Sequence, residues 1–298
     1  MAALLRISLW MAHFVSPLWA RRIAGFLGRI NYRLDLEATK VTRINLRTCF
    51  PNMEPAEIET MVRRRMHLVP LLFFEFSQLA HWPLDRLLGQ ILEVNAEELL
   101  TDAYQDSRGV LLLVPHFGNW EILCAFLGAH YSVAALYDRP KVTGLESVIV
   151  AARERYDGEM YPIDTGGMRS IFKTLKAGRL VAILPDQVPD RNGGIHVDFF
   201  GQPALTMTLS HKLIQRSRPR VLMGSVRRVF HRSNGYGYAL DFFELPDEVQ
   251  SEDAETSLRV MNTAIEQVVK TDPVQYQWEY KRFKRPPELG QTSIYRRQ

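Results

Sequence analysis

The chain has 298 residues, of which 46% are hydrophobic and 23% are charged, and its formal net charge is +4. This length suffices for one large α/β domain or for a core domain with a helical extension, and the composition excludes a wholly disordered chain. Two cysteines, Cys49 and Cys124, are too few for a disulfide framework or a cysteine-rich zinc site, so a reducing compartment is expected.

The excess positive charge is concentrated in a few places along the chain. Such basic groups suit anionic lipid head groups, phosphates or an acidic protein partner. We expect no nucleic-acid partner, because no stacking or groove-reading motif accompanies the charge. No spacing of histidine, cysteine or carboxylate residues predicts a metal site. The basic groups lie at 21–22, 63–65, 216–220, 227–228 and 281–285.

The first 30 residues contain the most unusual segment of the chain. Ile7 to Ala20 carry no formal charge and include two tryptophans, and Arg21 and Arg22 follow directly. This run of about 14 residues is shorter than the roughly 20 that a membrane-spanning helix needs. We therefore predict that residues 1–30 associate with a membrane as an interfacial helix or short anchor, on the cytoplasmic side that the two arginines favour. The alternative is a terminal helix packed on the domain.

Residues 31–106 are predicted to form a helical region. The segment Pro51–Met53 interrupts its first part. From Glu54 to Ala80, apolar residues then recur at helical spacing, and Pro70 is expected to kink or split that helix. This part of the chain is thus interpreted as a set of helices that precedes the sheet of the domain.

The pattern changes at Gly109, where an uninterrupted apolar run from Val110 to Val114 begins. Such a run is typical of a strand that is buried on both faces of a parallel sheet. The alternation that follows predicts an α/β core over residues 107–298, with a mixed β-sheet flanked by helices on both faces and with binding sites beyond the strand ends. Further strands are expected at 132–137, 160–163, 180–184, 220–228 and 236–245, and helices at 121–130, 145–156, 168–177, 205–216 and 254–270.

The clearest chemical feature is the string HFGNWE, from His116 to Glu121, which follows the first strand and opens a helix. On one regular helix these two residues would diverge by roughly 140°, so they meet only if His116 lies in the loop, and Gly118 allows that turn. A neutral imidazole could take a proton from an attacking hydroxyl, while a carboxylate on its other nitrogen would fix the tautomer. The alternative is a capping motif, in which Asn119 caps the helix and Glu121 favours its positive end.

This string closely resembles the signature of the late acyltransferases of lipid A biosynthesis, the lauroyl and myristoyl transferases of Gram-negative bacteria. The likeness extends over most of the chain, from about residue 40 to 285, in blocks that keep the family order. In one block, Asp138 stands as an insertion within a Tyr-Arg-Pro segment. The further blocks are Arg43–Leu46 with Cys49–Pro51, Tyr137–Pro140, Gly167–Arg169 with Leu175–Gly178, Leu184–Gln187, Phe199–Ala204, and Tyr276–Trp278 with Arg282–Lys284.

The resemblance implies an acyl donor carried as a thioester on acyl carrier protein and a lipid A precursor, a phosphorylated glucosamine lipid, as acceptor. It implies a site facing the cytoplasm at the bacterial inner membrane, in a sandwich like that of the glycerolipid acyltransferases. His116 would be the general base and Glu121 its partner. No cofactor is expected besides the donor thioester.

Four further residues are candidates for substrate binding, besides Asn119, whose first expected role is the cap. Arg169 could hold a phosphate or polarise the thioester carbonyl, or it is a surface arginine. Asp186 and Gln187 follow a strand and could bind acceptor hydroxyls or help orient His116, or they form a simple turn. Arg139 contacts phosphate or is merely solvated.

Two rival functions remain beside the lipid A reaction. The enzyme could acylate another glycolipid or a glycerolipid, although Glu121 and Leu184–Gln187 differ from the glycerolipid acyltransferase pattern. It could also be a catalytically silent relative that binds membranes, although the intact His116 and Glu121 argue against this. An apolar stripe either lines an acyl channel or packs in the core; it comprises Leu68, Leu71, Leu72, Phe73, Phe74 and Phe76.

Overall fold

The computed structural model describes residues 2–140, 146–233, 235–288 and 290–296. Its N-terminal part begins with two helices, α1 (Ala2–Ala12) and α2 (Pro17–Arg33). Residues 13–16 separate them, and the hydroxyl of Ser16 accepts a hydrogen bond from the amide of Trp19 in the first turn of α2. Across the described residues, no helix combines the length and the apolar character that membrane crossing requires.

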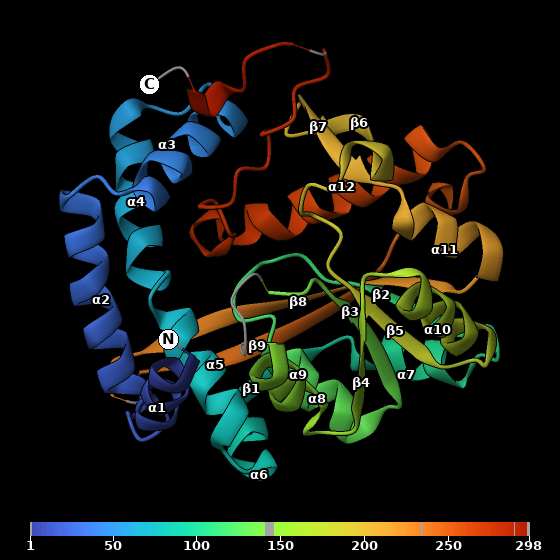
Figure 1. Ribbon diagram of the computed structural model, residues 1–298, viewed down its shortest axis with the longest axis horizontal. Coiled ribbons are helices and arrows are strands. Elements are labelled where there is room, and N and C mark those ends of the chain that lie inside the picture. Colours follow the sequence, from blue (N-terminus) through green and yellow to red (C-terminus); the bar gives the residue numbers. More distant parts are fainter. Residues whose placement is uncertain (1, 141–145, 234, 289, 297–298) are drawn as a thin grey trace.

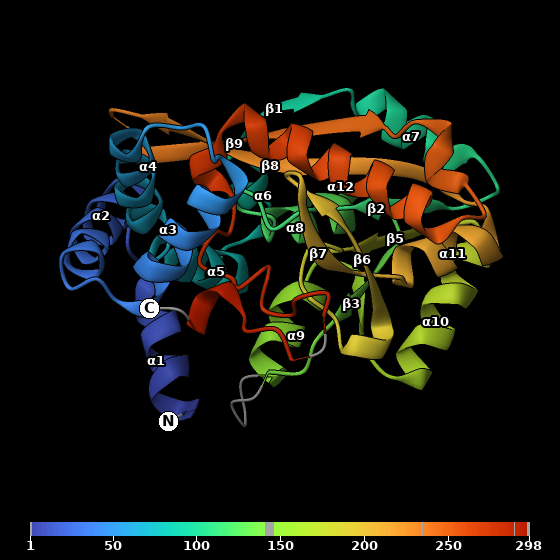
Figure 2. The ribbon, with the colours of Figure 1, turned by 90° about the horizontal axis from the view of Figure 1, so that it is seen from above.

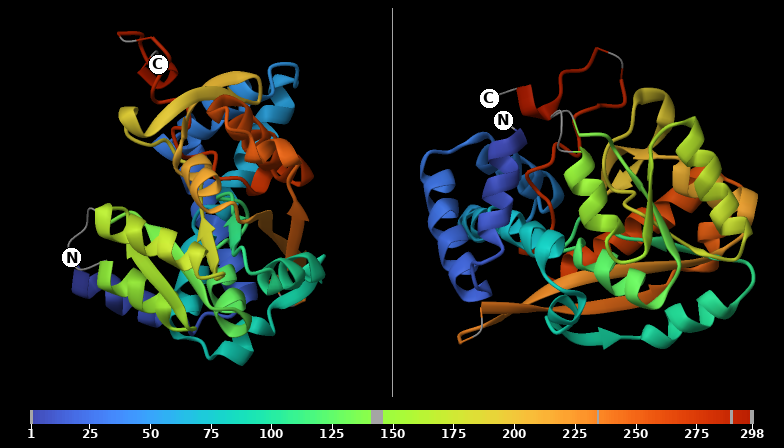
Figure 3. Two further views of the ribbon diagram at one scale, coloured as in Figure 1. Left: turned by 90° about the vertical axis from the view of Figure 1, so that its right-hand side faces the viewer. Right: turned by 60° about the horizontal axis from the view of Figure 1, so that its bottom comes forward.

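One face of each N-terminal helix packs on the domain while the other stays exposed. In α1, Leu9 is 3% exposed and its carbonyl accepts from the hydroxyl of Ser77. In α2, Gly28 lets the helix approach α4, because a Cβ there would lie 2.2 Å from the carbonyl oxygen of Met66. The two interpretations of residues 1–30 therefore do not exclude one another. Figures 1 and 3 show these helices in blue at one end of the molecule.

The predicted helical region contains five helices and one strand within the described residues. The helices are α3 (Glu37–Cys49), α4 (Pro55–Leu68), α5 (Leu71–His81), α6 (Leu84–Leu88) and α7 (Glu97–Gln105). As expected, the chain changes element at Pro70. The prediction of helices alone is wrong at β1 (Ile91–Asn95), which pairs in parallel with β9. Only this long-range pairing makes the segment a strand, so the local pattern did not reveal it.

The main sheet has seven strands in the order β1-β9-β8-β2-β5-β3-β4. Its pairs are parallel except for β8 with β9, so the predicted mixed sheet is confirmed. The central strand β2 lies between β5 and β8, which explains why its uninterrupted apolar run is fully buried. The strands are β2 (Val110–Leu113), β3 (Val133–Tyr137), β4 (Gly158–Pro162), β5 (Leu180–Ile183), β8 (Arg220–His231) and β9 (Gly235–Glu244).

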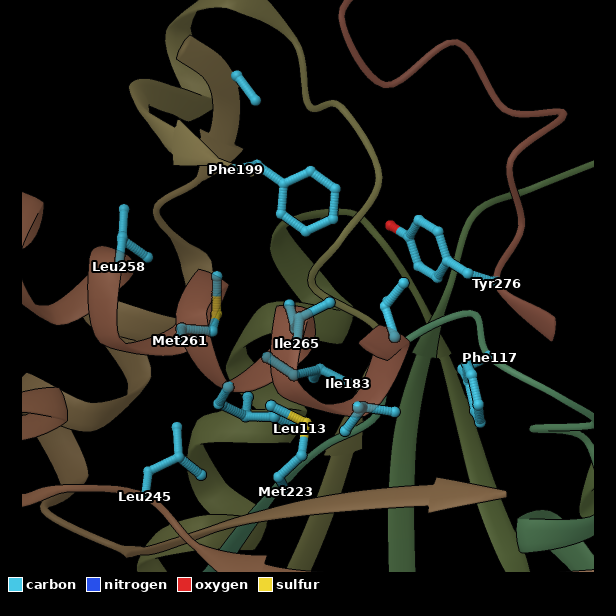
Figure 4. Packing of buried hydrophobic residues seen from close by; sticks show 14 of the residues in the cluster. Leu113, Phe117, Ile183, Phe199, Met223, Leu245, Leu258, Met261, Ile265 and Tyr276 are labelled. Carbon is cyan, nitrogen blue, oxygen red and sulfur yellow. The ribbon is translucent and has the colours of Figure 1, made fainter. Parts of the chain in front are cut away.

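Helices cover both faces of this sheet, and the alternation along β2 divides the core between them. Leu111 and Leu113 belong to the cluster under α10, α11 and α12, whereas Val110 and Leu112 belong to the cluster under α5 to α8. Figures 1 and 2 show the two layers, and Figure 4 shows Met261 and Ile265 of α12 above Leu113. These helices are α8 (Ile122–His130), α9 (Glu146–Glu154), α10 (Thr165–Lys176), α11 (Leu209–Ser217) and α12 (Ala254–Thr271). The helix predicted at 145–156 corresponds to α9. Its predicted first residue, Leu145, lies outside the described residues.

A second, two-stranded sheet was not predicted from the sequence. It consists of β6 (Gly194–Phe199) and β7 (Gln202–Met207), which pair in antiparallel. Phe200 and Gly201 turn the chain with φ of +52° and +69°. The helix expected from residue 205 therefore begins only at Leu209. Short 3-10 turns complete the chain at Arg191–Gly193, Asp247–Gln250, Pro273–Gln275 and Ile294–Arg296.

Candidate active site

His116 lies in the loop between β2 and α8, at the carboxyl end of the central strand. Gly118 makes the loop possible: its φ is +59°, and a Cβ atom there would lie 1.6 Å from the carbonyl oxygen of Val226. The amide of Gly118 donates to the carbonyl of Gln275 at 3.1 Å, and the amide of Gln277 donates to the carbonyl of His116 at 3.1 Å. The segment after α12 therefore fixes the backbone of the histidine.

Asp186 follows the neighbouring strand β5 and binds His116 twice. Its Oδ1 accepts from the Nδ1 of His116 at 2.7 Å, and its Oδ2 accepts from the His116 amide at 2.9 Å. Burial opposes ionisation of this carboxyl, but the charge and hydrogen bonds of His116 outweigh it and lower the pKa of Asp186. An ionised carboxylate only accepts hydrogen bonds, so Nδ1 carries a proton, and when the ring is neutral Nε2 keeps its lone pair. This is the tautomer that a general base requires.

Glu121 is not the partner of His116, and the predicted contact between the two is wrong. The carboxylate of Glu121 instead forms a two-pronged ion pair with Arg153 of α9, at 2.5 and 2.9 Å. Burial disfavours the charged form of Arg153, but the charge of Glu121 outweighs it and raises the pKa of the guanidinium. Because Glu121 immediately precedes α8, and α8 packs against α9, the arginine is its nearest charged partner.

The alternative interpretation of the motif, a cap made by Asn119, is also wrong. Glu121 occupies the N-cap position of α8, and no side chain caps that helix. Asn119 is 2% exposed, and its Oδ1 has no hydrogen-bond partner among the residues that the structure describes. Such burial favours a position inside the loop over the substrate contact predicted for this residue.

The other nitrogen of His116 faces Gln187. The Nε2 atoms of the two side chains are 3.1 Å apart, and the amide nitrogen of Gln187 also lies 3.1 Å from Oε1 of Gln277. The ring of Trp120 stands edge-on to the imidazole, with the centroids 4.8 Å apart. The structure thus brings together His116, Asp186 and Gln187 of the predicted site residues.

Arg139 and Arg169 lie at the same edge of the sheet but farther out. Arg139 is exposed and forms ion pairs with Asp164, at 3.2 Å, and Glu146, at 3.9 Å. Arg169 is exposed near the start of α10, directly after β4. The strand order places β4 three strands from β2, which is about 14 Å at the usual spacing. Arg169 therefore follows a strand that is not adjacent to the one before His116.

A fully buried ion pair lies beneath the loop. Glu75 of α5 and Arg228 of β8 are both 0% exposed in their side chains and meet at 2.5 and 2.6 Å. Gln275 joins this pair to the site: its Oε1 accepts from the amide of Arg228 at 2.8 Å, while its own carbonyl accepts from Gly118. Removing one partner of such a pair costs about 3–5 kcal/mol of folding free energy. We therefore interpret it as a support of the site.

Two residues at the site were not singled out by the sequence analysis. Arg153 stands among several charged residues of α9, and no local signal distinguishes it. Gln277 belongs to the block Tyr276–Trp278, so the family likeness was the one available signal. Both depend on contacts between elements far apart along the chain.

The apolar stripe of the helical region divides between core and surface. Leu71 and Phe74 are 1% and 8% exposed and belong to the core, whereas Phe73 is 37% exposed. These positions favour packing for part of the stripe. In the part of the chain that the structure describes, no group of three or more histidine, cysteine, aspartate or glutamate side chains could hold a metal ion.

Comparison of the sequence with known proteins identifies one family and several relatives. Residues 2–285 match the family described as bacterial lipid A biosynthesis acyltransferase. The chain is 29% identical over 279 residues to the lipid A biosynthesis lauroyltransferase of Escherichia coli (strain K12), covering 92% of this chain and 88% of that protein. It is 27% identical to the palmitoleoyltransferase of that organism over 256 residues (86% and 81%), and 26% identical to its myristoyltransferase over 300 residues (99% and 88%).

Proposed function

We propose a specific reaction for this site from one premise: the chain belongs to the bacterial lipid A biosynthesis acyltransferase family. It is therefore an O-acyltransferase of lipid A biosynthesis. The donor that we propose is a fatty acyl thioester on acyl carrier protein, and the acceptor is a hydroxyl of a lipid A precursor. As proposed, the reaction needs no cofactor besides the donor thioester.

In the proposed mechanism, His116 removes the proton of the acceptor hydroxyl. The single observation that supports it is the pair of hydrogen bonds that Asp186 accepts from His116, which hold a proton on Nδ1 and turn Nε2 away from the carboxylate. The oxygen attacks the thioester carbon, and the carbon–sulfur bond breaks. The departing thiolate takes the proton back from Nε2, so His116 ends the cycle neutral. Asp186 stabilises the imidazolium between these two steps.

Glu121 keeps a role in this proposal, but through Arg153. The ion pair joins the start of α8 to α9, and Arg153 is 21% exposed while Glu121 is 11% exposed in its side chain. The partly exposed guanidinium could then serve as a fixed donor towards the carbonyl oxygen that gains charge. Arg139 and Arg169 are candidates for contact with substrate phosphate, whereas a substrate contact by Asn119 would require the loop to open, because its side chain is buried.

Transfer of a labelled acyl group tests the proposal directly. Acyl carrier protein charged with radiolabelled lauroyl is mixed with a lipid A precursor, and the labelled lipid is measured. We expect His116→Ala to lower turnover by about 100- to 10,000-fold while the circular dichroism spectrum shows that the variant is still folded. If the folded variant transfers acyl groups at the normal rate, the general-base proposal is wrong. Transfer to a glycerolipid but not to the precursor would favour the rival acceptor class.

We also propose that residues 1–30 hold the enzyme at the cytoplasmic face of the inner membrane, with residues 31–298 as the acyltransferase domain. The exposed apolar side chains of α1, of α2 and of the turn between them support this proposal, among them Leu4, Trp10, Phe14, Trp19 and Phe26, each more than half exposed. Extracting an acyl chain into water costs roughly 0.8 kcal/mol per methylene, a cost that an enzyme at the interface avoids. In fold, we propose a sandwich related to that of the glycerolipid acyltransferases.

Point charges on α1 and in the turn after it test the membrane contact better than deletion, because Leu9 is part of the packed face. The rings of Trp10 and Phe14 lie 5.1 Å apart and form one exposed patch. We expect the double variant Trp10→Asp with Phe14→Asp to bind vesicles of phosphatidylethanolamine and phosphatidylglycerol at least about tenfold more weakly in a sedimentation assay. Leu92→Asp on β1, which is 48% exposed, is the matched control. Equal binding by both variants would show that the patch does not contact lipid.

A further inference from the structure

Gln187 and Gln277 form a hydrogen-bonded pair whose orientation is fixed by Asp186. Asp186 accepts from Nδ1 of His116, so in the neutral ring the Nε2 atom is the acceptor. Gln187, 3.1 Å away, must therefore present its amide N–H to that atom. The second N–H of the same amide points to Oε1 of Gln277, also at 3.1 Å. One assignment of donors and acceptors thus satisfies the entire chain of contacts.

Gln277 is itself held in place by its backbone. Its amide donates to the carbonyl of His116 at 3.1 Å, and its neighbour Tyr276 forms a β-bridge with Phe117. Gln187 is held by the next residue, Val188, whose amide donates to the hydroxyl of Tyr280 at 2.9 Å. Both glutamine side chains are partly exposed, whereas Asp186 behind the ring is 2% exposed. The side of the histidine that carries the glutamines is therefore the side open to a substrate.

The position of Gln187 coincides with that of the attacking hydroxyl. A hydroxyl that gives its proton to Nε2 must lie about 2.6–3.2 Å from it, where the Gln187 amide now stands. The hydroxyl can enter only if Gln187 releases Nε2. The bond from Gln187 to Oε1 of Gln277 is independent of the ring and can persist during that change.

We propose that Gln187 caps the catalytic nitrogen of His116 in the free enzyme and, once the acceptor hydroxyl displaces it, donates the released N–H to the oxygen of that hydroxyl. Gln277 is the positioning residue that anchors Gln187 through both states. The inference rests on the proposed acyl transfer, because it assigns the displaced contact to the acceptor. The hydroxyl proton passes to Nε2, and the oxygen bonds to the thioester carbon while the Gln187 N–H stays on that oxygen. The carbon–sulfur bond then breaks, and the departing thiolate takes the proton from Nε2.

A glutamate at position 187 would reverse the direction of this contact. A carboxylate accepts only, so it would favour a proton on Nε2 and place the ring between two carboxylates. Among the described residues, Asp186 is the one charged side chain bonded to the ring in the native chain. Gln187→Glu should therefore move the acid limb of the kcat/KM profile to higher pH by about one unit or more.

Two measurements on the full-length chain in detergent test the proposal. The first is nitrogen NMR of enzyme labelled at the histidine ring nitrogens, without substrate, with His116→Ala to assign the signal. We expect Nδ1 to be protonated and Nε2 to be a hydrogen-bonded acceptor at neutral pH. Gln187→Met should shift the Nε2 signal, and Gln267→Met, at an exposed position of α12, should leave it in place. Protonated Nε2 in the free native enzyme would overturn the proposal.

The second measurement compares two substitutions of Gln277 in the transfer assay with lauroyl acyl carrier protein. Gln277→Met removes the acceptor for Gln187 and should lower kcat/KM by about tenfold relative to the Gln267→Met control. Gln277→Glu keeps an acceptor oxygen and should retain the plateau rate within about threefold, with its acid limb at higher pH. Equal loss in both variants, or no loss in Gln277→Met, would overturn the anchoring role. A native enzyme that transfers no acyl group would contradict the proposed function instead, and the NMR result would still decide whether the cap exists.

Discussion

Two carboxylates at the active edge of the sheet differ in what they hold. Asp186 is 2% exposed, and its two oxygens each accept a hydrogen bond from His116. Glu121 is 8% exposed, and its two oxygens accept hydrogen bonds from Nε and Nη2 of Arg153. The first carboxylate fixes the orientation and tautomer of one ring, whereas the second joins α8 to α9.

The difference shows why proximity along the chain is a poor guide to a catalytic partner. Glu121 is five residues from His116, yet its side chain meets a fully charged guanidinium first. A bidentate pair with arginine satisfies a carboxylate better than one neutral imidazole does. The carboxylate that reaches the histidine follows the neighbouring strand β5, and its described hydrogen bonds go to His116 and to no arginine.

The largest effect on turnover is expected from removing the carboxylate acceptor at position 186. In Asp186→Asn, the amide cannot accept from both N–H groups of His116, and the ring can adopt the wrong tautomer. We expect turnover to fall by about 100- to 1,000-fold with little change in KM, measured by labelled acyl transfer at saturating donor. Loss confined to KM would contradict an orienting role and favour substrate binding by Asp186.

A double-mutant cycle separates the two carboxylates more finely. Glu121→Ala and Arg153→Ala should each lower kcat/KM by about 10- to 100-fold, and the double variant should lose little more than either single one, because the pair acts as a unit. Glu121→Ala combined with Asp186→Asn should instead lose roughly the product of the single effects. If the effects of substituting Glu121 and His116 on kcat/KM are non-additive, and those of Glu121 and Arg153 are additive, the catalytic pair predicted from the sequence would be supported instead.

The smallest expected effect concerns the pH dependence of stability. The pKa of Asp186 is lowered below its ordinary value of 3.8 in the folded chain, so its ionised form stabilises the fold. This contribution is fully present above pH 3.8 and is lost as the pH falls through the lower, folded-state pKa. We expect the native chain to be more stable than Asp186→Asn at pH 6, and the difference to shrink below about pH 4, as measured by chemical denaturation. A difference that does not change with pH would show that Asp186 is uncharged in the folded chain.

Elements with a strong local pattern could be predicted correctly from the amino-acid sequence. The apolar run at Val110, the histidine at its end and the turn at Gly118 all occur as predicted. The helices around Pro70 and the amphipathic α12 were also predicted from residue spacing. These features follow from local sterics and from burial with a fixed period, both of which can be read along a short segment.

Contacts between residues far apart along the chain could be identified only from the tertiary structure. Leu113 pairs with Ile183 in the parallel register of β2 and β5, and His116 and Asp186 each lie three residues beyond that pair. The strand β1 likewise exists through its pairing with β9. Such contacts depend on strand order and register, which arise when separate segments pack together to bury both faces of the sheet. A local pattern states that a segment will be a buried strand, but the choice of its neighbour is made by the energy of the whole core.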